Sequence, residues 1–166
     1  MRRYWLVFGV VAMVLGSGCR ATGMGWIQST DLVDKATFGF VFEGDTSTLS
    51  GSYHDPNGRT ALGTVDVAFK GTGVVRPCKV GDPPCAKAPA TVKGGCVAGE
   101  PSYTSQNPNI PGDGLFFLLV CDLDGTGGAG AGADFIFISV DTGPYAPYTN
   151  FGTPSGNITV RTEVSS

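Results

Sequence analysis

Charged side chains are scarce in this 166-residue chain: they make up 15% of it, and His54 is its only histidine. Lysine and arginine form no cluster after the first few residues, so the basic surface that neutralises nucleic-acid phosphates is missing. Sustained 3.6-residue hydrophobic periodicity is also missing beyond the N-terminal segment. A single histidine without a G-x-S-x-G motif offers no recognisable hydrolase machinery. We therefore expect neither nucleic-acid binding, nor a helical fold, nor catalysis.

The N-terminus has the parts of a bacterial export signal. Arg2 and Arg3 are basic, the eleven residues from Trp5 to Leu15 are uncharged and apolar, and small residues lead to Cys19. Eleven residues are too few to cross roughly 30 Å of hydrocarbon as a helix. The segment LGSGC, which ends at Cys19, resembles the lipobox of bacterial lipoproteins. In that motif the cysteine is lipidated and becomes the new N-terminus.

This motif predicts a lipoprotein signal peptide over residues 1–18, lipid on Cys19, a tether over residues 19–25 and one domain over residues 26–163. An ordinary signal peptide followed by a cysteine is the alternative. Without Arg2 and Arg3, nine basic residues remain against 14 acidic ones, a net charge of −5. Two or more acyl chains anchor stably, at ~0.8 kcal/mol per buried CH₂. We expect attachment to the bacterial envelope through this lipid. The outer membrane or cell surface is favoured, because Arg20 is not the aspartate associated with inner-membrane retention.

Short stretches with period-two alternation recur along the mature chain. In Ala36–Glu43 the phenylalanines at 38, 40 and 42 share one face, and Leu62–Lys70 and Asn157–Glu163 alternate in the same way. Pro, Gly and Asn signals predict a turn at Tyr53–Gly58, and glycines predict a break at Gly71–Gly73. The segment 101–114 has no periodicity and is predicted to be a long surface loop.

Seven or eight such strands with short connections predict an all-β fold, an antiparallel meander that forms a small closed or partly open barrel. A β-sandwich is the alternative. Ala36–Glu43 is too apolar for an exposed edge, so we expect the last strand to pair with it or to close onto it. The aromatic side chains expected to fill the interior are Phe38, Phe40, Phe42, Phe69, Phe117 and Phe135.

The most apolar part of the mature chain is Leu115–Asp141, which we interpret as a β-hairpin with a glycine-rich loop. Four cysteines remain besides Cys19, and an exported protein should hold them as disulfides. Three pairings are open, and we favour Cys78 with Cys85 and Cys96 with Cys121. A Cys₄ zinc site is the alternative, although the spacing lacks paired C-x₂-C knuckles.

The loop of this hairpin begins like a calcium-binding loop. Asp122, Asp124 and Thr126 fall at its first, third and fifth positions, with a glycine at the sixth, as the EF-hand requires. The twelfth position should be a glutamate but is Ala133, and Asp134 follows one residue late. We therefore expect a solvated loop and no cofactor, with a calcium site at Asp122, Asp124, Thr126 and Asp134 as the alternative.

His54 and the aromatic residues in or near loops are the remaining candidates for a functional role. His54 and Asp55 are consecutive strand residues, which point to opposite faces, so we expect a structural role for His54 rather than a catalytic one. The aromatic residues in or near loops are of the kind that line carbohydrate or peptide sites, but we expect them to cap the core. They are Tyr103, Tyr145, Tyr148 and Phe151.

Several segments together carry a family resemblance. They are GMGWIQS (23–29), KATFGF (35–40), GSYHD (51–55), DFIFI (134–138), Gly143 with Tyr145, and GNITV (156–160). In this order they resemble a bacterial secreted β-domain that is often labelled post-COAP-1. The resemblance covers almost all of the mature chain and implies an exported β-domain without established catalytic residues. The Cys78–Cys85 region and the longer hairpin loop depart from the family's pattern.

These observations predict a non-catalytic envelope lipoprotein, a binding or structural β-module whose protein or glycan partner the sequence does not name. The alternative is a carrier for a small ligand or carbohydrate, because a closed β-barrel of this size can enclose one small molecule. The large aromatic side chains argue against the carrier, since they would fill the interior.

Overall fold

The computed structural model describes residues 20–43, 48–125 and 134–161, and these residues have an all-β fold, as predicted. They form ten strands of one antiparallel sheet in the order β10-β1-β2-β3-β4-β5-β7-β8-β9, with β6 paired to β4 and β7. In these ranges no helix is long and apolar enough to span a membrane. The elements are β1 (Arg20–Gln28), β2 (Lys35–Glu43), β3 (Thr48–Thr60), β4 (Gly63–Cys78), the 3₁₀ turn η1 (Pro83–Cys85), β5 (Cys96–Gly99), β6 (Ser102–Ser105), β7 (Asp113–Asp122), β8 (Asp134–Val140), β9 (Tyr148–Gly152) and β10 (Ser155–Arg161).

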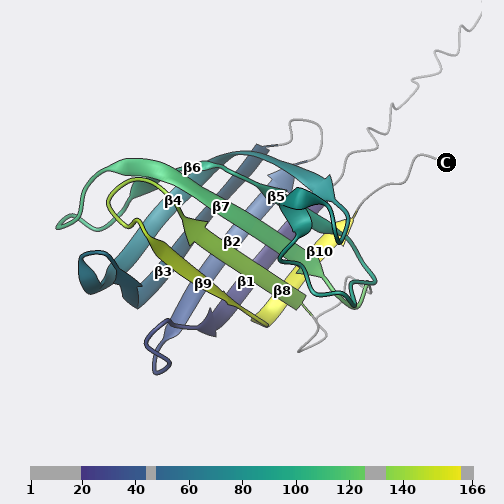
Figure 1. The fold of residues 1–166 in the computed structure, drawn as a ribbon, viewed down its shortest axis with the longest axis horizontal. Helices are drawn as coiled ribbons and strands as arrows, with labels where there is room; N and C mark the ends of the chain where they lie inside the picture. Colours follow the sequence, from purple (N-terminus) through teal and green to yellow (C-terminus); the bar gives the residue numbers. More distant parts are fainter. Residues whose placement is uncertain (1–19, 44–47, 126–133, 162–166) are drawn as a thin grey trace, which may run out of the picture.

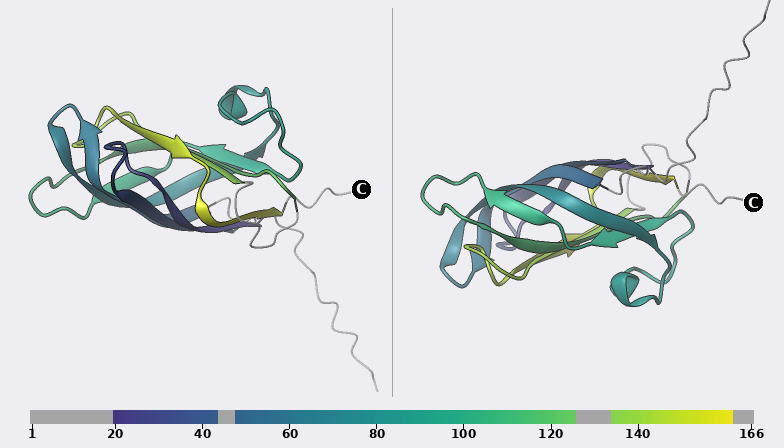
Figure 2. Two further views of the ribbon diagram at one scale, coloured as in Figure 1. Left: turned by 90° about the horizontal axis from the view of Figure 1, so that it is seen from below. Right: turned by 90° about the horizontal axis from the view of Figure 1, so that it is seen from above.

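The sheet folds over on itself, so that its two halves lie face to face (Figures 1 and 2). In Figure 1, β7, β8 and β9 cross in front of β1, β2 and β3. The long strand β4 carries the sheet from one half to the other, because it pairs with β3 along one side and with β5 and β6 along the other. This partial ring is compatible both with the predicted small barrel and with the sandwich.

Apolar side chains from both halves meet in one core. The period-two prediction for β2 is confirmed, since Phe38, Phe40 and Phe42 are at most 7% exposed. Leu118 and Ile138 face them from the other half. The void left between the halves is only about 20 Å³, room for roughly one water molecule. The interior is therefore filled by side chains.

The hairpin Leu115–Asp141 is confirmed, with β7 and β8 paired from Phe116 to Asp122 and from Val140 to Asp134. The prediction that Phe117 and Phe135 fill the interior is wrong, because Phe116 and Ile136 take those places. Phe117 and Phe135 pack on the outer side of the sheet, in a second apolar cluster with the two disulfides. This part of β7 has apolar side chains on both faces, so hydrophobicity alone did not set its phase.

The predicted tether is also wrong over residues 20–25. They belong to β1, which lies between β2 and β10 and pairs with both from Arg20 onward. The last described strand therefore pairs with β1, so the direct pairing with β2, one of the two arrangements expected, is not formed. Edge protection for the apolar β2 is achieved by β1 instead. The sheet therefore already includes residues 20–25, while residues 1–19 lie outside the described ranges.

Two predicted interruptions are absent from the described strands, and the loop predicted over residues 101–114 is confirmed only over residues 106–112. The segment 53–58 continues β3, with an irregular register between Asp55 and Gly58, and β4 continues through Gly71. A Cβ at Gly71 would lie 2.5 Å from the ring of Phe116. That glycine allows a close approach of ring to backbone and does not end the strand. The segment 101–114 contains β6, whose Tyr103 is buried.

Candidate functional site

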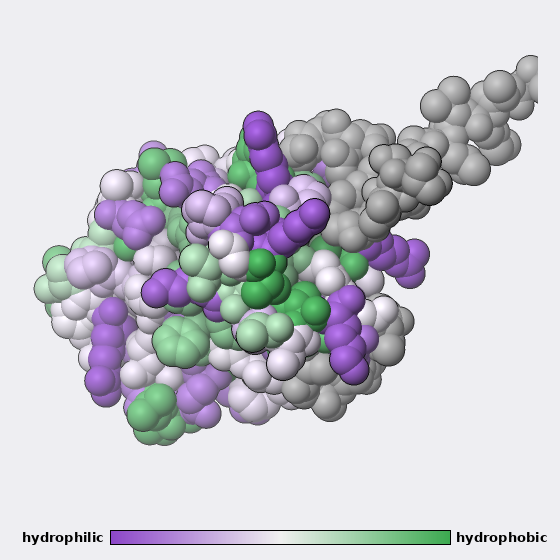
Figure 3. Space-filling model, turned by 45° about the vertical axis from the view of Figure 1, so that its right-hand side comes forward, coloured by the Kyte–Doolittle hydropathy of each residue, from purple (hydrophilic) through white to green (hydrophobic). Residues whose placement is uncertain are grey.

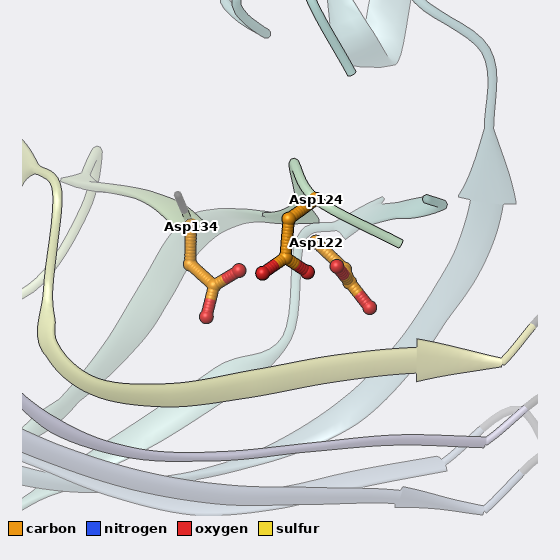
Figure 4. A group of neighbouring side chains, drawn as sticks. All are labelled: Asp122, Asp124 and Asp134. Carbon is orange, nitrogen blue, oxygen red and sulfur yellow. The ribbon is translucent and has the colours of Figure 1, made fainter. Parts of the chain in front are cut away.

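Three aspartates gather where β7 ends and β8 begins. The ladder places Asp122 directly opposite Asp134, and Asp124 follows two residues after Asp122. One carboxylate oxygen from each lies within 4.8 Å of the others, and Figure 4 shows the three side chains turned toward one another above β10. The structure therefore brings together three of the four predicted calcium ligands. The fourth, Thr126, lies outside the described residues.

Two of these carboxylates also serve the outer edge of β10. Asp134 Oδ2 accepts the backbone N–H of Ile158 at 2.7 Å, and Asp122 Oδ2 accepts that of Val160 at 3.4 Å. Asp122 Oδ1 accepts the N–H of Gly125 at 2.8 Å. Because no strand among the described residues pairs with β10 on this side, the side chains satisfy donors that a further strand would otherwise take.

The cluster is electrostatically unfavourable without a cation. Asp122 is 2% exposed and Asp134 is 4% exposed. Burial raises the pKa of Asp134 above its ordinary value, and the neighbouring charges of Asp122 and Asp124 add to this increase. The N–H of Ile158 acts in the opposite direction, because it stabilises the carboxylate. A divalent cation would relieve the repulsion among the three groups.

The donor set suits a hard cation, since calcium takes roughly six to eight oxygen ligands. At least three of the six carboxylate oxygens already accept N–H groups. The arrangement also differs from an EF-hand, because Asp134 arrives through strand pairing and not through the loop's twelfth position. Asp122, Asp124 and Asp134 could hold an ion here, and they also have a structural role that needs none.

A second buried carboxylate, Asp55 on β3, is surrounded by neutral donors. It is 0% exposed, and the side chain of Ser29 donates a short hydrogen bond to it. The hydroxyl of Tyr148 donates to it at 2.8 Å, and the backbone N–H groups of Asn57 and Thr30 donate at 3.2 Å and 3.4 Å. These donors come from three separate parts of the chain, so Asp55 joins the loop before β2 to β3 and β9.

A chain of hydrogen bonds extends from this carboxylate across the core. The hydroxyls of Tyr148 and Tyr53 lie 2.5 Å apart, and the amide of Asn150 donates to Tyr53 at 2.9 Å and to the carbonyl of Gln28 at 3.0 Å. Burial raises the pKa of both tyrosines far above the ordinary value, and Asp55 raises both further. Both hydroxyls therefore stay protonated and act as donors.

This network was not predicted, although one sequence signal pointed to it. The alternation that places Tyr53 inward on β3 also places Asp55 inward, two residues later. The buried donors come from residues as far as 93 positions away, which no local pattern reveals.

The chain was compared with protein families, curated proteins and solved structures. No family model, no curated protein and no solved structure matches this chain.

The remaining predicted residues are placed as follows. Both disulfides are confirmed, Cys78 with Cys85 and Cys96 with Cys121, so none of these thiols remains for zinc. Cys19 lies outside the described residues. His54 Nε2 lies 2.8 Å from Asp66 on the outer face, where both side chains are about half exposed.

His54 and Asp55 do point to opposite sides of β3, as predicted. Of the loop aromatics, Tyr103, Tyr145 and Tyr148 are buried and cap the core, as predicted, whereas Phe151 is 61% exposed. Phe151 continues a row of aromatic side chains on the outer face. The sequence interpretation missed this row, because it placed Phe117 in the interior and gave Phe137 no face.

Proposed function

We propose that this protein is a non-catalytic lipoprotein of the bacterial cell envelope, a binding or structural β-module held at a membrane by lipid on Cys19. The observation that carries the proposal is the cysteine inventory. The chain has five cysteines, and four of them pair in two disulfides, which leaves Cys19 alone at the end of the lipobox-like segment. Disulfides favour an exported location, because cytosolic thiols are kept reduced.

The placement of β1 gives this anchor a geometry. Because β1 begins at Arg20, directly after Cys19, no linker separates the lipid from the sheet. Nine strand residues at ~3.3 Å each span about 30 Å. The loop between β1 and β2, with the exposed Leu32 and Val33, would therefore lie about that far from the anchored end. The domain would stand directly on the membrane with a defined end facing outward.

The carrier alternative receives less support. Ligand pockets usually measure about 300–1,000 Å³, whereas the void between the two halves of the sheet is about 20 Å³ and is lined by apolar side chains. A ligand of this protein would therefore bind on the outside.

We also propose that the domain is of the post-COAP-1 type. The segments that carry the resemblance lie in or beside β1, β2, β3, β8 and β10, which include both strands paired with β1. We further propose that the lipid attaches the protein to the outer membrane or the cell surface, because Arg20 is not the aspartate associated with inner-membrane retention.

The test of the anchor is metabolic labelling of the full-length protein in a bacterial host with an alkyne fatty acid. We expect the wild-type protein to carry the label and to be recovered in the membrane fraction. Its mass should match a mature chain whose first residue is Cys19. The Cys19→Ala variant should lose both label and membrane recovery. An unlabelled wild type that is secreted as a soluble protein would disprove the proposal.

A further inference from the structure

The outer face of the second half of the sheet carries a row of phenylalanines. Strand alternation turns Phe117 of β7, Phe137 of β8 and Phe151 of β9 away from the core. The ring centroids of Phe117 and Phe137 lie 6.0 Å apart, and those of Phe137 and Phe151 lie 6.1 Å apart. The three rings thus form a continuous apolar strip across neighbouring strands, and Phe151 at its end is largely exposed.

A groove lies beside this strip, under the loop that the Cys78–Cys85 disulfide closes. Two hollows of about 500 Å³ and 270 Å³ share Phe117, Glu100, Pro83 and Pro84 in their linings, so they form one elongated groove. The combined space is within the size range of ligand-binding sites. Figure 2 shows the loop with η1 standing off the sheet, and Figure 3 shows green apolar side chains in the middle of this side, surrounded by purple hydrophilic ones.

The polar lining of the groove is balanced in charge. Arg76 and Glu100 line the larger hollow, and Lys87, Glu100 and Asp141 line the smaller one. Two cationic and two anionic side chains therefore surround an aromatic floor. A strongly charged ligand finds no matching field here, whereas an uncharged ligand rich in hydroxyl groups finds both donors and acceptors.

Backbone recognition is not available along the floor. β7 is paired on both sides, with β5 and β6 on one and β8 on the other, and β8 is paired with β7 and β9. Pro83 and Pro84 on the wall have no N–H to donate. An extended peptide would bring main-chain groups that need partners from a strand edge. Along β7 and β8 the ligand therefore meets side chains only, which favours a ligand without such a main chain.

We infer that this groove binds a neutral oligosaccharide, with the apolar faces of sugar rings packed on Phe117 and Phe137 and the hydroxyl groups bonded to Arg76, Glu100, Lys87 and Asp141. The inference rests on the proposed function as a binding module and names the ligand class. Aromatic rings with nearby polar side chains combine the apolar contact and the directional hydrogen bonds that such a ligand requires.

The test uses the mature lipoprotein, extracted in a detergent that contains no sugar. Chitohexaose, cellohexaose and mannohexaose are titrated against it by calorimetry and by NMR. We expect saturable binding of at least one of them, with shifted amides confined to the end of β4 at residues 74–78, β5 with Glu100, β7, β8 with Asp141, and the loop 79–95. Phe117→Ala should weaken that binding about tenfold or more, as truncation of a central anchor does, and Glu100→Gln should weaken it less.

Leu115→Ala is the matched control, because Leu115 is exposed on the same strand but lines neither hollow. It should bind as the wild type does, and thermal melts should show that all variants are folded. No binding at millimolar sugar, an equal loss in Leu115→Ala, or binding of a neutral peptide in place of the sugars would overturn the inference. Since the titration does not depend on membrane attachment, an acylated protein that binds no sugar contradicts this inference alone. A protein without lipid on Cys19 contradicts the proposed anchor alone.

Discussion

Two acidic sites in this protein differ in how their buried carboxylates are stabilised. Asp55 is a single carboxylate enclosed by neutral hydroxyl and N–H donors from distant segments. Asp122 and Asp134 are equally inaccessible, but each has other carboxylates as neighbours and only a few backbone donors. A buried charge is tolerated when its hydrogen bonds are complete. The first site is thus complete within the protein, whereas the second would gain from a cation.

The largest loss of stability is expected when the hydrogen-bond network around Asp55 is disrupted. Asp55→Ala removes the shared acceptor of Ser29, Thr30 and Tyr148. Buried donors that lose their acceptor cost ~1–3 kcal/mol each, so the free energy of unfolding should fall by at least about 3 kcal/mol in a urea titration. Asp66→Ala is the control, because its half-exposed pair with His54 should contribute under about 1 kcal/mol. Equal losses in the two variants would contradict the role assigned to Asp55.

The incomplete site is tested with calcium itself. If Asp122, Asp124 and Asp134 hold the ion, calcium at about a hundredfold excess over its dissociation constant should stabilise the fold by ~2.7 kcal/mol. A thermal melt with calcium, compared with one in chelator, measures this. Asp124→Asn should abolish the difference, since Asp124 offers a carboxylate without carrying either of the β10 contacts. An unchanged wild-type midpoint would leave the cluster with its role at the edge of β10 only.

Two smaller losses of stability compare a tyrosine that donates to a charged acceptor with one that donates to a neutral acceptor. Tyr148→Phe deprives Asp55 of one donor and Tyr53 of its partner, and should cost about 2 kcal/mol. Tyr103→Phe removes a hydroxyl that donates to the carbonyl of Thr142, and should cost about 1 kcal/mol. Urea titrations of the two variants give the comparison, and a larger loss for Tyr103→Phe would be the contrary result.

The smallest effect is the pH dependence of the cluster. The folded state raises the pKa of Asp134 above 3.8, chiefly through burial. It therefore binds this proton more readily than the unfolded chain does, and stability should fall as pH rises from 3.8 through the raised value. Asp134→Asn keeps an oxygen for the N–H of Ile158 and should lack this fall in urea titrations at several pH values.

Asp31 contributes a pH dependence of stability with the opposite sign. The backbone N–H groups of Asp34 and Val33 lower its pKa, so its contribution is present above pH 3.8 and disappears as pH falls through the lowered value. A wild type whose stability changes with pH in the same way as that of Asp134→Asn would contradict the assignment to the cluster.

The fold was largely readable from local patterns. Phe38, Phe40 and Phe42 gave the face of β2, and the apolar arms around the glycine-rich loop gave the β7–β8 hairpin. The favoured disulfide pairing was also correct. Patterns of this kind depend on neighbours in sequence, so they are visible without a structure.

The misses have a common cause in contacts between distant residues. Gly71 resembled a strand break, but it exists to admit the ring of Phe116. Tyr103 was expected to cap the core from a surface loop, but it lies on the strand β6, where it packs against Phe69 and Tyr145. The Asp55 network and the outer aromatic groove both join strands that are far apart along the chain, so their residue types appeared in the sequence without their grouping.

The position of β1 between β2 and β10 has a consequence for how the protein is made. The first strand of the domain cannot gain its second neighbour until the last strand is available, since Arg20 pairs with Arg161. Closing so long a segment of chain is entropically costly and tends to slow folding. The sheet is therefore completed only after nearly the whole polypeptide is available, and until then β1 can pair with β2 alone.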